Sequence, residues 1–288
     1  MNDVSKISSN ASVILFADDT NIFFSDSIYA RLQQNIQKDL NALSDWFAAN
    51  KLSLNIDKTN FIVFNGNDDM IDFNIDINGK LLQRVDCVKF LGVFIDSKLS
   101  WHDHIKYIST TVAKGVGVLS KLKHILPRSI LRSLYQTLIL PHLTYCCTIW
   151  SGCSKYLLNK LFILQKRAIR HITFSQARDH TNDLFKSLNL LKLIDLINLY
   201  VASFVYRSLH KMLPHSLKAY FTHNSSIHSH NTRQADHLHT RKCLNNLYRK
   251  SLHYRAITLW NPLPPTLKAK PSLVSFRKNL QRYFISLY

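Results

Sequence analysis

The sequence contains no glutamate, so its 18 acidic residues are all aspartates. Their distribution is uneven. Residues 1–100 hold nine Lys and Arg against thirteen Asp (net −4), whereas residues 101–288 hold 28 Lys and Arg against five Asp (net +23). A positive excess of this size favours a polyanionic partner such as nucleic acid. The alternative is a solvated basic surface with no such partner.

Glycine, proline and cysteine are scarce. Six Gly and seven Pro in 288 residues exclude a low-complexity linker protein. The five Cys form no CxxC pair, and the opening MNDVSKISSN lacks the basic start and apolar core of a secretory signal. This pattern predicts free thiols in an intracellular protein, without distinguishing nucleus from cytoplasm. No apolar run approaches the ~18–20 residues of a membrane-spanning helix, so we expect no membrane partner.

Apolar spacing predicts an α+β chain whose first part is mixed and whose second part is mostly helical. The runs SVILF and NIFF flank ADDT, which predicts a tight hairpin of two buried strands. Spacings of three and four then predict a helix that ends near Asn50, and Asn78–Gly79 predicts a turn between strands. Further helices are expected at 105–122, from Pro127, at 154–172, from about 193 to 210 and near 273–284. The expected regions are 1–100, 101–220 and 221–288.

The segment SVILFADDTNIFF places two adjacent carboxylates, Asp18 and Asp19, between apolar runs. Two such groups at a hairpin tip repel each other, and a divalent cation removes the repulsion. Mg²⁺ prefers oxygen ligands and is often held by one or two carboxylates together with substrate phosphates. Because Asp is also common in turns that bind nothing, the motif by itself is a weak prediction of a metal site.

Further motifs follow the carboxylate pair in order. FADD between two apolar strands resembles the metal-binding motif in the palm of reverse transcriptases. LSDWFAANKLSLNIDKTNFIVF resembles the next motif of that family, VKFLGVFID resembles its primer-grip hairpin, and Trp101–Leu122 resembles the start of the thumb. Three later segments resemble the C-terminal region of non-LTR (LINE-like, jockey/CR1-type) retrotransposon polymerases. They are LYQTLILPHLTYCCTIW, LNKLFILQKRAIRHI and LWNPLPPTLKAKPSLVSFRKNL.

The resemblance implies RNA-directed DNA synthesis, a nucleotidyltransferase reaction that uses an RNA template, a DNA primer, dNTP and Mg²⁺. Asp18 and Asp19 would be the catalytic Mg²⁺ ligands. Lys58 would stabilise the pyrophosphate leaving group, although a turn lysine that is merely solvated is the alternative. The primer backbone would lie against Phe90, Leu91 and Gly92.

The start of the chain departs from the family pattern. Asn2–Asp3 matches the end of a family motif, so the fingers, the strand with the other catalytic Asp and the Gly-rich nucleotide-selecting loop are expected to be missing. A two-metal site needs carboxylates from two strands. The chain is therefore expected to be a fragment that binds nucleic acid without polymerising DNA alone. The alternative is a repurposed basic helical module that binds an acidic protein partner.

Cationic side chains on two of the predicted helices form a second candidate site. They are Lys121, Lys123 and Arg128 at a helix junction, and Lys166, Arg167 and Arg170 on the following amphipathic helix. Phosphate contacts from these residues would give salt-sensitive binding without sequence preference. The aromatic residues Tyr135 and Trp150 are expected in the core, and the alternative is that they stack on bases. Cys146 and Cys147, beside Trp150, are expected to be buried apolar residues.

The segment 221–243 is polar and rich in histidine, which predicts a long loop. It lacks the paired CxxC or HxxxH spacing of structural zinc sites, so no zinc site is expected there.

Overall fold

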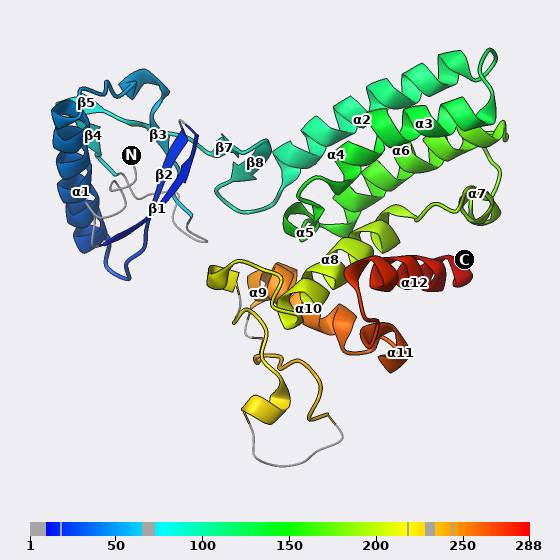
Figure 1. The fold of residues 1–288 in the computed structure, drawn as a ribbon. Helices are drawn as coiled ribbons and strands as arrows, with labels where there is room; N and C mark the ends of the chain where they lie inside the picture. The colour runs from blue at the N-terminus through cyan, green and yellow to red at the C-terminus, as the bar shows by residue number, and fades with distance from the viewer. Residues whose placement is uncertain (1–9, 18, 65–72, 218, 228–233, 244) are drawn as a thin grey trace. The chain divides into compact units, whose positions relative to one another are not determined.

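The computed structural model describes residues 10–17, 19–64, 73–217, 219–227, 234–243 and 245–288. The fold is α+β, as predicted, with short strands and one long helix in the first part and the remaining helices after them (Figure 1). The chain divides into two units. The first comprises Met1–Lys89 with Asp96–Lys98, and the second comprises Phe90–Ile95 with Leu99–Tyr288.

The first unit contains one long helix and strands that pair two by two. An antiparallel hairpin of β1 (Ala11–Phe16) and β2 (Asp19–Phe24) precedes α1 (Tyr29–Ala49). A 3-10 turn, η2 (Ile56–Lys58), leads to β3 (Asn60–Phe61), which pairs in parallel with β6 (Gln83–Arg84). Strands β4 (Asp76–Ile77) and β5 (Lys80–Leu81) pair antiparallel. Their connection, Asn78–Gly79, has φ values of 54° and 75°, which confirms the predicted turn.

The core of the first unit is small. Leu43 and Phe47 of α1 are its buried centre, and Val13 of β1 and Ile22 of β2 pack against them. The Gln37 side chain fixes α1 to β4, because its Nε2 donates to the Asp76 carbonyl and its Oε1 accepts from the Asp76 N–H. Helix α1 therefore covers one face of the hairpin.

The predicted burial of both hairpin strands is wrong. Ile14, Phe16 and Phe23 are 46%, 57% and 45% exposed. Successive side chains of a strand point to opposite faces, and these three lie on the face opposite the Val13–Ile22 pair. Since α1 covers only the face with Val13 and Ile22, the second face remains open in the described chain.

The second unit is helical. A hairpin of β7 (Cys87–Phe90) and β8 (Val93–Asp96) leads into it along the sequence. The helices at 105–122, after Pro127, at 154–172, 193–210 and 273–284 are confirmed to within a few residues. The full set is α2 (His102–Leu122), α3 (Arg128–Leu138), α4 (Leu140–Thr144), α5 (Cys147–Trp150), α6 (Lys155–Thr173), α7 (Asn182–Leu188), α8 (Leu193–Leu209), α9 (Asn246–Lys250), α10 (Leu252–Trp260), α11 (Pro265–Lys268) and α12 (Leu273–Ser286), with 3-10 turns η3 (His215–Leu217) and η4 (Asn224–Ser226).

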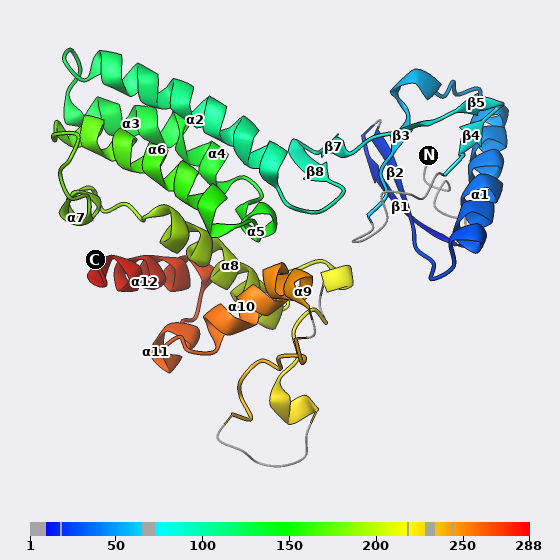
Figure 2. The same cartoon turned by 180° about the vertical axis from the view of Figure 1, so that it is seen from behind.

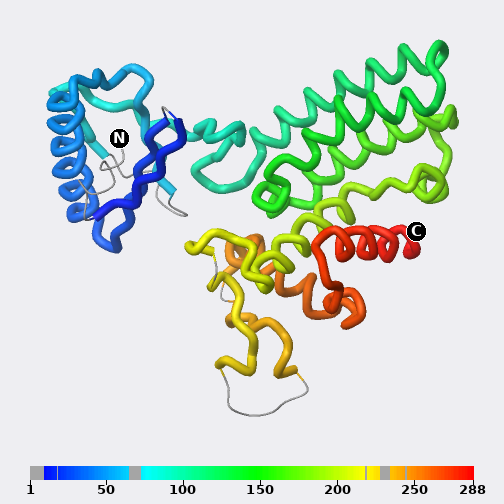
Figure 3. Tube along the Cα trace, viewed as in Figure 1, coloured from blue at the N-terminus to red at the C-terminus, as the bar shows by residue number. Residues whose placement is uncertain are grey.

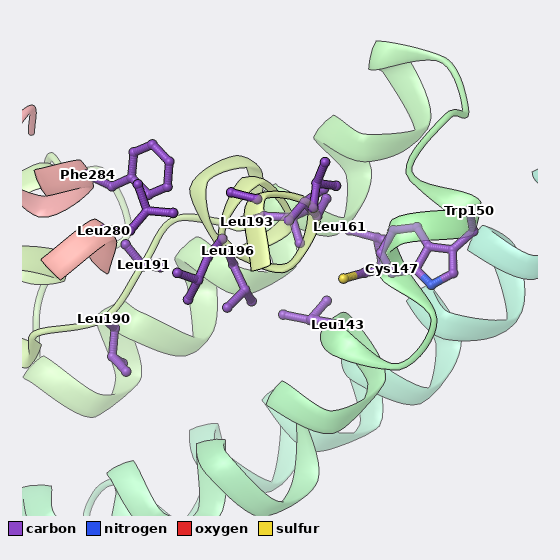
Figure 4. Packing of buried hydrophobic residues seen from close by; sticks show 14 of the residues in the cluster. Leu143, Cys147, Trp150, Leu161, Leu190, Leu191, Leu193, Leu196, Leu280 and Phe284 are labelled. Carbon is purple, nitrogen blue, oxygen red and sulfur yellow. The ribbon is translucent and has the colours of Figure 1, made fainter. Parts of the chain in front are cut away.

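Two groups of helices share one hydrophobic core. Helices α2, α3 and α6 lie side by side, and α8 packs against α10 and α12 (Figures 1 and 2). Helices α4, α5 and α6 also contact α8, so they join the two groups. Figure 4 shows this junction, where Leu143, Cys147 and Leu161 lie near Leu193 and Leu196.

Tyr135 and Trp150 are buried in this core, as predicted. The Trp150 indole donates to the Tyr145 carbonyl at 2.7 Å, and Gln165 Nε2 donates to the Tyr135 hydroxyl at 3.0 Å. Burial raises the pKa of Tyr135 to about 12. Both aromatic side chains are therefore used for internal packing and hydrogen bonding.

The connection from α5 to α6 lies directly against the end of α9. A Cβ added to Gly152 would be 2.4 Å from the Lys250 carbonyl oxygen. Arg255 on α10 reinforces the contact, since its Nη1 donates to Ser151 Oγ and its Nη2 to the Thr148 carbonyl, each at 2.7 Å. The backbones at Gly152 and Lys250 thus approach as closely as glycine permits.

In the part of the chain that the structure describes, no single helix has the length and apolar character to cross a bilayer. The pair α7 and α8, bent by 52° at the break, meets those two criteria together. Ten side chains of α8 are buried within the protein, among them Leu193, Ala202 and Val205. Helix α8 is therefore a core helix of the second unit.

Candidate nucleic-acid interface

The FADD segment lies at the tip of the β1–β2 hairpin. Phe16, the last residue of β1, pairs with Asp19, the first residue of β2. Ala17, which follows Phe16, has a left-handed φ of 53°. Asp19 is exposed. Asp18, the first predicted metal ligand, lies outside the described residues.

Lys58, the third predicted catalytic residue, ends the 3-10 turn η2 and has an exposed side chain. Its N–H donates to Asn55 Oδ1 at 3.2 Å, and the neighbouring Asp57 forms an ion pair with Lys80. Among the described residues, no hydrogen bond or ion pair joins Lys58 to Asp19. The turn therefore fixes the backbone of Lys58 and leaves its ammonium group in solvent.

The described residues do not complete a metal site. Carboxylate oxygens suit Mg²⁺, but an octahedral ion needs several ligands, and of the predicted pair only Asp19 is described. Within the described ranges, no three His, Cys or Asp side chains are grouped so that they could hold an ion.

The predicted primer-grip residues form the turn between β7 and β8. Leu91 and Gly92 have φ values of 44° and 82°, which suit a two-residue hairpin turn. Phe90 and Leu91 are half-buried, whereas Gly92 is exposed. The Tyr145 hydroxyl donates to the Leu91 carbonyl at 2.6 Å, and a Cβ on Gly92 would lie 3.4 Å from the Tyr145 ring. Tyr145 therefore anchors this turn to the segment between α4 and α5.

A pocket of about 710 Å³ lies beside this turn. Its lining includes Gly92, Tyr107, Tyr145, Tyr200 and His104. His104 is 2% exposed, and its Nδ1 accepts the Phe94 N–H at 3.3 Å. Burial lowers the pKa of His104 to about 4, so the imidazole is neutral at physiological pH.

We expect acid to destabilise the protein through His104. Its pKa is about 4 when folded and 6.5 when unfolded, so the unfolded chain gains the proton first as the pH falls. This contribution to stability is complete above pH 6.5 and is lost between pH 6.5 and 4, by up to about 3 kcal/mol. Urea denaturation of wild type and His104→Phe at pH 7 and pH 5 measures it. An equal loss of stability in both proteins would contradict the assignment.

The two groups of cations predicted from sequence meet at one end of the helical unit. Helices α2 and α6 pack against each other, and their C-terminal ends lie together (Figure 3). The pKa of His171, in the last turn of α6, is lowered first by burial and then by the charges of Lys123 and Arg167. The charges of Lys123, which follows the last residue of α2, and of Arg167 on α6 therefore both act on His171.

The six predicted cations divide by what they contact. Arg170 donates from Nε and Nη2 to the Asp179 carbonyl, at 3.1 and 2.8 Å, and Arg128 Nη2 donates to Ser187 Oγ at 2.9 Å. The Lys166 ammonium lies 4.8 Å from the Phe162 ring centroid. No side-chain hydrogen bond or ring contact is found for the other three in the described structure; these are Lys121, Lys123 and Arg167. We call these three the terminal cations.

Arg255 and Arg249 were not predicted as site residues. Both line a second pocket between α8, α9 and α10. The available signal was the segment 241–255, which holds five Lys and Arg and no Asp.

Comparisons with known proteins give a consistent relationship. The chain is 26% identical over 188 residues to "RNA-directed DNA polymerase from mobile element jockey" of Drosophila melanogaster. The aligned region covers 64% of this chain and 20% of that protein. It is 25% identical over 187 residues to "Probable RNA-directed DNA polymerase from transposon BS" of the same fly, covering 62% of this chain and 20% of that protein.

A third relative comes from the wasp Nasonia vitripennis. The chain is 27% identical over 159 residues to its "Retrovirus-related Pol polyprotein from type-1 retrotransposable element R1 2", covering 51% of this chain and 38% of that protein.

The chain spans about a fifth of the length of the first two relatives. No protein-family model matches it, and no solved structure does. The resemblance drawn from the motifs is nevertheless confirmed: the chain is similar in sequence to the RNA-directed DNA polymerases of non-LTR retrotransposons.

Proposed function

We propose that this chain is part of the RNA-directed DNA polymerase of a mobile element and binds an RNA template and a DNA primer. The main support for this proposal is the similarity of the chain to such a polymerase over 64% of its length. In this proposal residues 1–100 belong to the palm, 101–220 to the thumb and basic region, and 221–288 to the C-terminal tail.

The placement of charge supports the nucleic-acid part of the proposal. Lys123 and Arg167 are 44 positions apart in sequence, yet the charges of both lower the pKa of one histidine, His171. Lys121 is exposed two residues before Lys123, in the last turn of α2. Phosphates bind such clusters through charge alone, which does not require a particular base sequence. The other proposed contacts are the Phe90–Gly92 turn and the remaining cations, Arg128, Lys166 and Arg170.

The proposal assigns the metal chemistry to the longer parent enzyme. There Asp18 and Asp19 would contribute carboxylates to Mg²⁺ and Lys58 would face the leaving pyrophosphate, with a further Asp supplied by another strand. The 288-residue chain by itself is proposed to bind without turnover. Primer extension on an RNA template with Mg²⁺ tests this part, and incorporation that disappears in Asp18→Ala would overturn it.

Binding is expected to be strong at low salt and to weaken steeply as salt rises. With about six phosphate contacts, affinity for a primer–template duplex should fall on the order of 10³-fold between 50 and 200 mM salt, because each contact releases counterions. Filter binding of the full chain across this range measures the slope. No binding at 50 mM would overturn the proposal and favour an acidic protein partner.

A further inference from the structure

A second pocket, of about 300 Å³, lies between α8, α9 and α10. Asn198 of α8, Arg249 of α9, and Arg255 and Thr258 of α10 are among its lining residues. Two guanidinium groups therefore border a small pocket that is open to the surface of the second unit.

Arg255 is a half-buried cation with neutral partners. It donates to the Lys250 and Thr148 carbonyls and to the Ser151 hydroxyl, at 3.1, 2.7 and 2.7 Å. Burial lowers its pKa, because the charged guanidinium loses part of its contact with water. No ion pair between the described residues includes Arg255 or Arg249. A cation withdrawn from water without a counter-charge strongly favours an anionic ligand.

Donor capacity remains for such a ligand. A guanidinium has five N–H donors, and the three hydrogen bonds of Arg255 use three of them. Arg249 is exposed at the end of α9, and its side chain has no hydrogen bond within the described structure. Two guanidinium groups suit the oxygens of a phosphate, which accept paired hydrogen bonds.

The surrounding segment strengthens the positive potential. The charge of Arg241 lowers the pKa of His253, after the larger effect of burial, so a further guanidinium lies near the start of α10. No Asp occurs between Asp236 and the end of the sequence.

We propose that the pocket between α8, α9 and α10 binds a phosphate group, with Arg255 as its inner donor and Arg249 at its rim. We infer that this phosphate group belongs to the backbone of the bound nucleic acid, an identification that rests on the proposed function. Inorganic phosphate has the same oxygens and would also fit the pocket.

Two variants separate this pocket from general charge effects. Arg249→Gln removes the rim cation without disturbing an internal hydrogen bond. Lys250→Gln is the matched control, because it removes the same charge at the next residue, outside the pocket lining. Arg255→Gln is not the primary variant, since it also removes the bonds that hold α10 to α5.

The first measurement uses inorganic phosphate as the probe. Phosphate at constant ionic strength should raise the thermal unfolding midpoint of wild type and of Lys250→Gln more than that of Arg249→Gln. The rise in unfolding midpoint that remains in Arg249→Gln measures the general effect of phosphate as an excluded solute. Equal shifts in all three proteins would overturn the proposal.

The second measurement uses single-stranded RNA in the filter-binding assay. Arg249→Gln should weaken binding about fivefold at 0.15 M salt and lower the salt slope by about 0.7, the value for one phosphate contact on a single strand. Lys250→Gln should change neither as much. A phosphate effect without RNA binding would retain the pocket and reject the proposed function. RNA binding with equal behaviour of both variants and no phosphate effect would reject the pocket alone.

Discussion

Replacing Gly152 with alanine is expected to destabilise the protein by about 3 kcal/mol or more. The added Cβ would lie 2.4 Å from the Lys250 carbonyl oxygen and 3.4 Å from its carbonyl carbon. Both are backbone atoms, so no side-chain rotation relieves the clash. The α5–α6 connection must separate from α9, which also disturbs the Arg255 bonds to Thr148 and Ser151. Urea denaturation monitored by tryptophan fluorescence measures the loss.

Two other glycines provide graded controls on α2. Gly117 is exposed with no atom within 4 Å of an added Cβ, so Gly117→Ala should stabilise the helix by about 1 kcal/mol. A Cβ on Gly115 would lie 2.8 Å from Ile139 Cγ1, a side-chain atom, and no closer than 3.3 Å to a backbone atom, the Leu138 carbonyl oxygen. Gly115→Ala should fall between the two. A Gly152→Ala protein as stable as wild type would mean that the α9 backbone is not where the structure places it.

Neutralising the terminal cations together should weaken RNA binding about 50-fold at 0.15 M salt. The variant is Lys121→Gln, Lys123→Gln and Arg167→Gln. Each lost phosphate contact lowers the slope of log K against log salt by about 0.7 on a single strand, so three lower it by about 2. Because these side chains have no internal hydrogen bonds in the described structure, the fold should be retained. Filter binding from 50 to 200 mM salt, with circular dichroism as a fold check, tests this.

The matched control neutralises cations at a different place on the second unit. Lys278 and Arg282 are exposed on α12, and Arg207 is exposed at the end of α8. Their triple glutamine variant removes the same total charge. If both variants lose the same affinity, the binding reflects net charge alone and the terminal cations are not the interface.

The regular helices were predictable because one physical rule determines them. Helix α2 buries Ile105, Ile108, Val112 and Leu119, which follow the period of an α-helix. Helices α7, α9 and α11 were not predicted, because four to seven residues are too few to show a period. Their formation depends on packing against neighbours that are distant in sequence.

The candidate site was predictable as residue types but not as contacts. The sequence identifies Lys123 and Arg167 as cations, yet only the packing of α2 against α6 lets the charges of both act on His171. Likewise, Arg170 and Arg167 look equivalent in sequence, although Arg170 is bound to the Asp179 carbonyl. The exposed face of the β1–β2 hairpin was not predicted from the sequence. Apolar residues on both faces of a strand predict that both faces are buried, but the strand sequence does not show whether another element covers each face.

The separate hydrophobic clusters of the two units make a single melting midpoint an incomplete description of this protein. The cluster around Leu43 and Phe47 is small, whereas the one that contains Trp101, Trp150 and Trp260 extends through the helices. Calorimetry should therefore resolve a weak early transition and a strong late one, which is three-state behaviour. Of the four indole chromophores, only Trp46 reports on the first unit. Total emission mainly follows the late transition.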